Sequence, residues 1–404
     1  MADWSPQDVE EVLKILYPKG VSDVLAPSCE LYRRLKKNPK ALRGKKREVP
    51  IVYAGAGGVS SDFSSAKSTM NPAKYKSFEI PRRKIYALGQ LTGEWLAAAQ
   101  GEEASLVDGL REAMDRTAYS LQRAMAAYLY GDGTGVIGEI DSSSNVATAT
   151  IKLKNPTEAL RFEEGMVVQA WDGSSSTPRD SGATAEIVAV DPDAGTITAN
   201  GNWSTLISGI QVGDKLLRKG DLNNVGMGLA GWLPTTAPTS GDNFFGVDRS
   251  ANPNRLAGVR VNGSGGSIDE VLIAAANRVA LYGGRPDVAF LNHLDFSEIA
   301  IARQSYLQIK DGTNKPTLGF ESFKIMGPRG PIEVVPDADC PQGTAYLLTM
   351  SSWELGSAGD LPFLEQRDGM RIHRLSDDDG FGFEFKGYWN LYTNAPGHNA
   401  VITF

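Results

Sequence analysis

The sequence EEASLVDGLREAMDRTAYSLQRAMAAYLY, residues 102–130, carries the strongest structural signal in the chain, and GDGTG follows it at residues 131–135. Apolar or small side chains recur there every three or four positions, as on one face of an amphipathic helix. These positions are Leu106, Leu110, Ala113, Met114, Thr117, Leu121, Ala124, Met125 and Tyr128. Glu102 and Glu103 suit the start of such a helix and Gly131 suits its end. The pattern predicts one helix of roughly 40 Å over residues 102–130.

The residues before this helix predict two extended segments around a loop. Val49–Tyr53 has the alternation of a strand, and a second strand-like pattern covers residues 75–85 with Pro81 at its middle. Between them, residues 55–71 are rich in Gly, Ser and Ala. The unit offers few apolar residues for a core of its own, and a loop of this length is usually functional or disordered.

The N-terminal part is predicted to form a short helix and then a basic arm. Ser5 and Pro6 suit the start of a helix that ends before Pro18. The basic residues that follow are Arg33, Arg34, Lys36, Lys37, Lys40, Arg43, Lys45, Lys46 and Arg47. Pro39 and Gly44 interrupt this stretch, so we expect an arm rather than a packed element.

The sequence pattern of residues 147–219 is typical of a small all-β unit. Short alternating segments are separated by turn sequences, of which 191–195 (DPDAG) is a hairpin turn. We expect an inserted small β-barrel. Farther along, 267–282 is a predicted helix with Ser267 as its N-cap, 287–291 a buried strand and 294–303 a helix, with mainly short strands after residue 319. Helices and strands are mixed without a regular βαβ rhythm, which favours an α+β fold.

Composition excludes several classes of protein. The 404 residues carry a formal net charge of -7, which does not favour a general nucleic-acid binder. The two cysteines, Cys29 and Cys340, fit neither a zinc motif nor a disulfide framework, so a reducing cytosol is expected. Acidic residues among the first 17 positions argue against a signal peptide, and no apolar run is long enough to span a bilayer.

The search for catalytic or metal-binding motifs returns nothing specific, so we expect no cofactor and no enzyme. His293, His373 and His398 are far from both cysteines in sequence and form no HExxH motif. The glycines at 55–58 precede no apolar helix, and those at 131–135 follow the negative end of one, so neither predicts a phosphate site. The acidic run 377–379 lacks the spacing of a calcium loop.

Several stretches, taken in order, resemble the major capsid proteins of tailed bacteriophages, a family with the Hong Kong 97-like fold. They are 129–135 (LYGDGTG) at the end of the long helix, 245–250 (FGVDRS) with 256–258 (LAG), 330–337 (GPIEVVPD) with Trp353, and 361–363 (LPF) with Tyr388 and 394–396 (NAP). They are spread over most of the chain, and their order carries the resemblance.

The resemblance implies a domain organisation. Residues 1–47 would be an N-terminal arm, 48–86 an extended loop over a neighbouring subunit, and 87–140 a peripheral domain with the long helix as its spine. Residues 141–222 would be an inserted β-rich domain, 223–366 the axial domain, 367–393 return strands of the peripheral domain, and 394–404 a C-terminal axial segment. The barrel departs from the basic family fold, although some members carry an insertion nearby.

The implied function is self-assembly into pentamers and hexamers that form the icosahedral head around double-stranded DNA. The protein would be made in the host cytoplasm and end in the virion. Portal, scaffolding and decoration proteins are further expected partners, the packaged DNA would be contacted only loosely, and no membrane partner is expected. No long helical leader is evident, so we expect a separate scaffolding protein or none. Two alternatives remain: another virion protein such as a tail tube, or a hydrolase with a barrel accessory domain.

Assembly contacts are expected at two places. The candidates are Lys45, Lys46, Arg47, Ile51, Tyr53, Tyr75 and Phe78. The basic stretch 33–47 could pair with acidic surfaces of adjacent subunits or with DNA phosphates, and we favour the first because subunit contact is the family's use of this arm. Some family members link the extended loop to a neighbour through a Lys–Asn bond. None of Lys67, Lys74 and Lys76 can be matched to that lysine, so we expect noncovalent contact.

Overall fold

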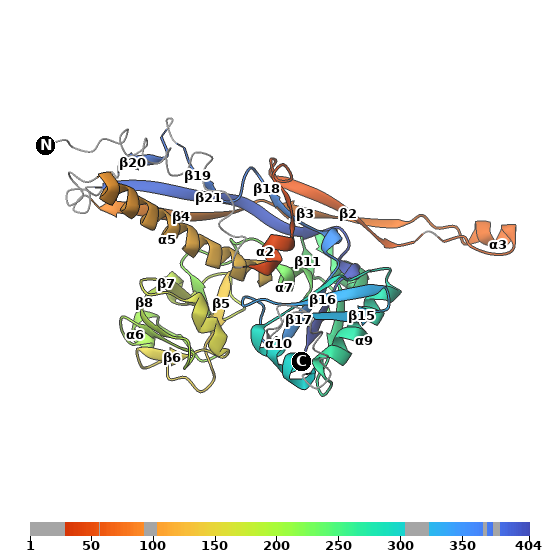
Figure 1. Cartoon of the computed structure of the whole chain (residues 1–404). Coiled ribbons are helices and arrows are strands. Elements are labelled where there is room, and N and C mark those ends of the chain that lie inside the picture. Colours follow the sequence, from red (N-terminus) through yellow and green to blue (C-terminus); the bar gives the residue numbers. More distant parts are fainter. Residues whose placement is uncertain (1–28, 56, 93–102, 304–322, 367–369, 375–379) are drawn as a thin grey trace, which may run out of the picture.

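In Figure 1, the long predicted helix lies along the strands β4 (Arg83–Thr92) and β21 (Gly380–Thr393). The computed structural model describes residues 29–55, 57–92, 103–303, 323–366, 370–374 and 380–404. Helix α5 runs from Glu103 to Tyr130, which confirms the prediction. The predicted helix near residues 5–17 and the acidic run 377–379 lie outside the described residues.

Helix α5 packs on a sheet whose centre is the fourteen-residue strand β21. Phe381, Phe383 and Phe385 alternate along β21 and, with Ile372, meet the apolar stripe of α5. Strand β4 pairs antiparallel along one side of β21, and β18, β19 and β20 pair along the other. The strands are β1 (Lys36–Asn38), β4 (Arg83–Thr92), β18 (Trp353–Ser357), β19 (Phe363–Leu364), β20 (Ile372–Arg374) and β21 (Gly380–Thr393).

A second six-stranded sheet forms a separate lobe with its own apolar core. Its order is β13-β22-β17-β14-β16-β15, with parallel and antiparallel neighbours. Its elements are β13 (Val259–Asn262), α9 (Ile268–Leu281), β14 (Val288–Leu291), α10 (His293–Arg303), β15 (Phe323–Gly327), β16 (Gly330–Pro336), β17 (Thr344–Leu348) and β22 (Ala400–Thr403). The predicted helices and buried strand are confirmed here. Ser267 does stand at the N-cap of α9, but its side chain makes no capping hydrogen bond.

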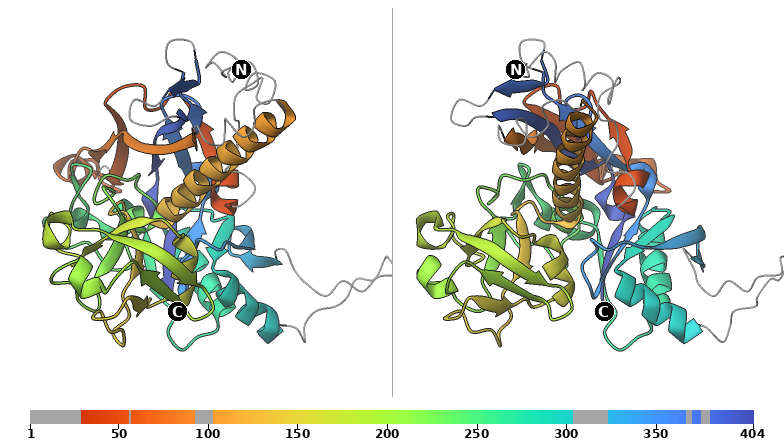
Figure 2. Two further views of the ribbon diagram at one scale, coloured as in Figure 1. Left: turned by 90° about the vertical axis from the view of Figure 1, so that its left-hand side faces the viewer. Right: turned by 60° about the vertical axis from the view of Figure 1, so that its left-hand side comes forward.

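The residues predicted to be all-β form a third sheet, entirely antiparallel, in the order β5-β10-β7-β8-β9-β6. A bridge between Ile140 and Leu153 links the two outermost strands. The elements are β5 (Val136–Glu139), β6 (Thr150–Lys152), η1 (Pro156–Arg161), β7 (Val167–Trp171), η2 (Arg179–Gly182), β8 (Ala185–Asp191), β9 (Thr196–Ala199), α6 (Trp203–Leu206) and β10 (Lys215–Arg218). Figure 2 shows this unit and the second sheet as two lobes on one side of the α5 sheet.

A two-stranded hairpin extends away from these three sheets (Figure 1). Strands β2 (Lys46–Ala54) and β3 (Lys74–Pro81) pair antiparallel, and the short helix α3 (Phe63–Ser68) lies at the tip. The two predicted extended segments are thereby confirmed. The remaining short elements connect the sheets; they are α2 (Glu30–Arg34), α7 (Leu229–Trp232), β11 (Asn243–Phe244), β12 (Val247–Asp248), η3 (Arg249–Ala251), α8 (Pro253–Leu256), η5 (Met350–Ser352) and η6 (Pro396–His398).

The basic stretch is not the unpacked arm that we expected from its charge. Strand β1 pairs in parallel with β18, and four apolar residues among the charged ones are buried. They are Leu31, Tyr32, Leu35 and Leu42. Because these side chains bury apolar surface while the lysines and arginines stay at the surface, the segment packs in spite of its charge. None of the described helices is long and apolar enough to cross a membrane.

Candidate assembly surfaces

The base of the β2–β3 hairpin is fixed to its own chain by aromatic packing. Phe78 lies edge-on to Trp232 and Phe244, with ring centroids 5.2 and 6.0 Å away. Two polar contacts continue the attachment: the Glu79 backbone N–H donates to the Phe245 carbonyl (2.9 Å), and Lys76 Nζ donates to the Asp248 carbonyl (3.0 Å). Farther along β2, Asn252 Nδ2 donates to the Tyr53 carbonyl (3.1 Å). The paired strands of the hairpin are therefore attached to the rest of the described chain along much of their length.

The tip of the hairpin, residues 55–71, exposes apolar side chains that no described residue covers. Val59, Phe63 and Met70 are 94%, 82% and 72% exposed. Helix α3 buries none of its residues and is held by its N-cap, where the Asp62 carboxylate accepts from the Ser65 N–H (2.8 Å). The sequence suggested a flexible loop here because this helix has no apolar stripe, which is the signal that sequence reasoning uses.

The four predicted contact residues of the hairpin that are apolar or aromatic lie in different environments. Phe78 and Ile51 are buried in the core of their own chain, and Tyr53 is half-buried beside Lys76. Tyr75 is 65% exposed. The expectation that the hairpin has little core of its own is thus wrong at its base, where apolar residues on both strands meet the aromatic residues after α5. Tyr53 and Tyr75 are the ones with surface left for a neighbouring subunit.

Much of the positive charge in residues 33–47 is neutralised within the chain. Arg34 makes two hydrogen bonds to the Glu333 carboxylate (2.8 and 2.9 Å), which raise the pKa of the guanidinium. Lys36 pairs with Glu354 at 2.6 Å. Lys46 and Arg47, two of the predicted interface residues, also have intrachain partners: Lys46 pairs with Glu79 (2.8 Å), and Arg47 lies 3.9 Å from Glu354 and over the Tyr392 ring.

Three basic side chains of this stretch remain exposed without a charged partner among the described residues. They are Lys40, Arg43 and Lys45. Of the three predicted basic contact residues, Lys45 is therefore the one that offers an unneutralised charge to another molecule. Exposed ion pairs such as that of Lys46 contribute little to stability and can exchange partners.

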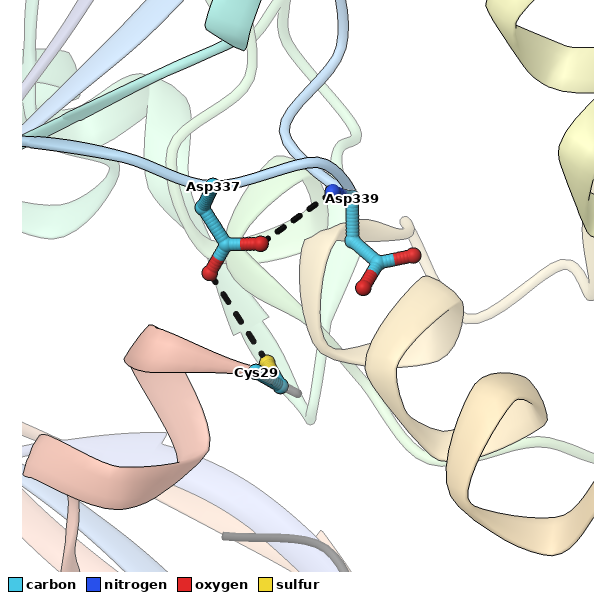
Figure 3. Close-up of side chains that lie close together, drawn as sticks. All are labelled: Cys29, Asp337 and Asp339. Carbon is cyan, nitrogen blue, oxygen red and sulfur yellow. Dashed lines mark hydrogen bonds between the residues drawn. The ribbon is translucent and has the colours of Figure 1, made fainter. Parts of the chain in front are cut away.

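A buried carboxylate, that of Asp337, connects three distant parts of the chain (Figure 3). Its Oδ2 accepts from Tyr130 Oη at the end of α5 (2.8 Å) and from the Leu31 N–H in α2 (3.2 Å). Its Oδ1 accepts from the Asp339 N–H (3.1 Å). Sequence reasoning did not single out Asp337, since its partners are separated from it by up to 306 residues and no local pattern marks it.

Asp337, Asp339 and Cys29 are close enough to be considered as metal ligands. The chemistry does not fit a metal. Both oxygens of Asp337 already accept hydrogen bonds, and burial raises the pKa of the Cys29 thiol well above its usual value, which disfavours the thiolate that a metal needs. Cys29 Sγ instead lies 3.8 Å from Asp337 Oδ2 as a weak donor. We interpret the group as a structural junction.

The other residues that sequence analysis tested for chemistry are dispersed. His293 begins α10, His373 lies in β20 at 3.8 Å from Glu384, and His398 lies in η6, where burial lowers its pKa. Cys340 is a buried free thiol. Within the described residues, no nucleophile, base and orienting group come together.

Comparison with known proteins is informative at the level of structure. No protein-family model matches the chain. No curated protein matches it in sequence. Among solved structures, a chain of the cyanophage A-1(L) capsid asymmetric unit matches with a TM-score of 0.54 and 16% identity, over 96% of this chain and 98% of that one.

Two further matches have TM-scores below 0.5. One is to the capsid of a native GTA particle, with a TM-score of 0.46 and 12% identity over 96% of this chain and 92% of that one. The other is to Mycobacterium phage Adephagia, with a TM-score of 0.44 and 10% identity over 100% and 98%. At 16% identity the cyanophage match shows a shared fold. The resemblance indicated by the sequence is thereby confirmed, and the chain has the fold of a phage capsid protein.

Proposed function

We propose that this chain is a structural protein of a phage head. Copies of it assemble into pentamers and hexamers, and these close into an icosahedral shell that encloses double-stranded DNA in the virion. The work of the protein is mutual contact rather than catalysis, so we propose no enzymatic activity. The fold shared with the cyanophage capsid chain supports this assignment.

The single observation that carries the proposal is the hairpin. In an isolated monomer, the end of this projection leaves the apolar side chains of Val59, Phe63 and Met70 exposed to water. Exposed apolar surface of this kind marks a contact with another protein. In a shell each subunit can cover the tip of its neighbour, and many modest contacts of this type sum to a stable particle.

The domain assignment made from the sequence is part of the same proposal. The sheet around α5 corresponds to the peripheral domain, the second sheet with α9 and α10 to the axial domain, and the hairpin to the extended loop. The third sheet corresponds to an inserted small barrel, which the Ile140–Leu153 bridge supports by linking its outer strands. We place this insertion on the shell exterior, where it can be added without disturbing subunit contacts.

Further partners are proposed from the same reading. They are a portal protein, and possible scaffolding and decoration proteins, during assembly in the host cytoplasm. The free charges at Lys40, Arg43 and Lys45 support contact with acidic surfaces of adjacent subunits, since the chain is acidic overall. Loose contact with packaged DNA is the alternative use of the same charges.

Negative-stain electron microscopy of the purified protein tests the proposal. The native chain is expected to form closed shells, or free pentamers and hexamers. A triple variant, Val59→Ser, Phe63→Ser and Met70→Ser, is expected to lose closed particles while the isolated protein keeps its thermal stability. The reason is that these side chains are exposed in the single chain and so do not contribute to its core.

A matched control changes equally apolar side chains elsewhere. Leu160→Ser in η1, Val188→Ser in β8 and Val212→Ser in the turn before β10 alter three residues of the lobe that contains the third sheet, and these residues are 45–49% exposed. This variant should still form shells. Tubes in place of shells would favour a tail-tube protein, and a strictly monomeric protein at all salt and protein concentrations would exclude the capsid proposal.

A further inference from the structure

A basic cleft lies where the start of β4, the middle of α5 and the segment after β10 meet. Its volume is about 820 Å³, within the range of ligand-binding sites. Six basic residues line it: Arg82, Arg83, Lys84, Arg116, Arg218 and Lys219. The one acidic residue in the lining is Asp221. The cleft therefore favours a negatively charged ligand, although the chain as a whole is acidic.

Two buried donors of this cleft have no hydrogen-bond partner among the described residues. They are Arg218 Nε and Trp389 Nε1. The Trp389 side chain is completely buried, and its six-membered ring packs where a Cβ on Gly226 would lie. Folded proteins rarely leave buried N–H groups unpaired, because each one loses its water without a replacement. Both side chains line the same cleft. Their N–H atoms lie beneath its surface, so an acceptor can satisfy them only by inserting between the side chains.

The strand that borders the cleft has a free edge. Strand β4 pairs with β21 along one side, and no other described strand pairs with it. Residues 83–88, the first six of β4, line the cleft together with Arg82 just before them. Unpaired backbone N–H and C=O groups on an edge strand can accept an added strand from another chain.

We propose that this cleft binds an extended acidic segment of another protein chain, with one carboxylate of that segment held by Arg218 and Trp389. The segment's backbone pairs with the free edge of β4. Its carboxylate enters the cleft and accepts from Arg218 Nε and Trp389 Nε1. Lys84 and Lys219 at the rim attract the remaining acidic side chains, whereas Arg116 pairs with Glu112 of its own helix.

A peptide fits the cleft better than a nucleic acid does. The unpartnered donors are buried, so they are reached by a side chain that inserts rather than by the phosphates on the outside of a duplex. A free strand edge is matched by a polypeptide backbone and by nothing in DNA.

Fluorescence anisotropy of the full-length protein tests the proposal. The probe is a labelled peptide that alternates Asp with Val, and the comparison peptide has Asn in place of every Asp. The acidic peptide is expected to bind at least about tenfold more tightly than the Asn peptide, because the Asn peptide has no charged carboxylate to accept the hydrogen bonds. Arg218→Gln should weaken the binding of the acidic peptide about tenfold. Trp389→Phe, which removes the indole N–H together with part of the buried ring system, should weaken it about threefold in a protein whose fold is intact.

The matched control is Lys324→Met, which removes an exposed charge on β15 in the other lobe and should leave the affinity unchanged. Equal weakening by this control would overturn the proposal in favour of general charge attraction. If circular dichroism shows that Arg218→Gln is misfolded, Trp389→Phe decides alone, and unchanged binding by a folded Trp389→Phe protein refutes the site.

Competition separates the possible sources of negative charge. Inorganic phosphate and a short DNA duplex are not expected to displace the peptide. If the duplex displaces the peptide from the native protein but does not bind the Arg218→Gln variant, the cleft is a nucleic-acid site instead. The absence of any saturable peptide binding would also exclude the proposal. The measurement does not depend on shell formation, so its failure leaves the proposed function untouched.

Discussion

At the scale of single residues, Asp337 and Asp339 show how two neighbouring carboxyl groups acquire different roles. Asp337 accepts hydrogen bonds from α2, from α5 and from its own loop, and so joins segments that are remote in sequence. Asp339 lies beside it. Burial and the charge of Asp337 raise the pKa of Asp339 to about 6, against the opposing effects of Arg161 and Arg123.

This pKa predicts a pH-dependent stability. The pKa of about 6 in the folded protein lies above the ordinary aspartate pKa of 3.8, so between these values the folded protein keeps a proton that the unfolded chain has released. The Asp339 contribution to the free energy of unfolding therefore falls as pH rises from about 4 to about 6. Asp339→Asn should be more stable than the native protein at pH 7 by about 3 kcal/mol, measured by urea unfolding.

The gain should shrink on acidification and vanish near pH 4, where Asp339 is protonated in both states. The exposed Asp360→Asn is the control and should change stability little at either pH. A gain that is the same at pH 4 and pH 7 would show that the effect comes from packing and not from the charge.

The burial and the contacts of individual residues were the features of the structure that the sequence predicted least well. Ile51 and Phe78 were expected to face a neighbour, yet both are buried at the hairpin base. Arg34 was expected to meet another molecule, yet its partner Glu333 lies 299 residues away in the same chain. Such pairings depend on which distant segments the fold brings together, and a strand pattern or a run of charge contains no information about that.

At the scale of elements, the sequence was far more informative. The stripe of α5, the cap position at Ser267 and the turn at residues 191–195 are local signals, and each lies in the element that was predicted. In the turn, the Asp191 carboxylate accepts from the Asp193 and Ala194 N–H groups, which is the reason that aspartate suits this place. Strand β1 was missed because it has three residues and depends on β18 for pairing.

Gly89 sets how closely α5 approaches its sheet, and this gives a prediction for the pair of elements. A Cβ at this position would lie 2.2 Å from the Phe383 ring and 2.6 Å from Thr117 Oγ1 on α5. Gly89→Ala should therefore destabilise the protein by about 1–3 kcal/mol, as overpacking does. Chemical unfolding of the unassembled protein measures the change. Gly55→Ala, where the added methyl group meets nothing within 4 Å, should be nearly neutral.

At the scale of the whole molecule, the α+β class and the capsid resemblance could be predicted because the order of the elements can be inferred from the sequence without knowing their contacts. The arrangement of the lobes could not. It is set by a few long-range junctions: Asp337 with Tyr130, Arg123 with Glu163 (2.8 Å), and Arg161 with the Asp339 carbonyl (3.0 Å). These contacts connect α5 to the third sheet and to the loop after β16.

The last prediction concerns the hairpin in the assembled state. Ordering a residue costs about 1–2 kcal/mol of backbone entropy, and the tip at residues 57–71 has no buried side chain to offset this cost in a single chain. Its backbone amides should therefore exchange with deuterium quickly in unassembled protein and more slowly in shells, where a neighbour covers Val59, Phe63 and Met70. The central strand β21, buried along its length, provides the internal reference and should be protected in both states.

Equal protection of the tip in both states would mean that the hairpin is ordered within a single chain, because contact with a neighbour would then not have slowed the exchange of its amides. A denaturing gel of the same shells tests how the contact is made. Lys67, Lys74 and Lys76 lie on or near the tip, and we expect single-chain bands because apolar contact, not a covalent bond, holds the loop. A ladder of linked subunits would instead assign one of these lysines to a bond between chains, and substituting each in turn would identify it.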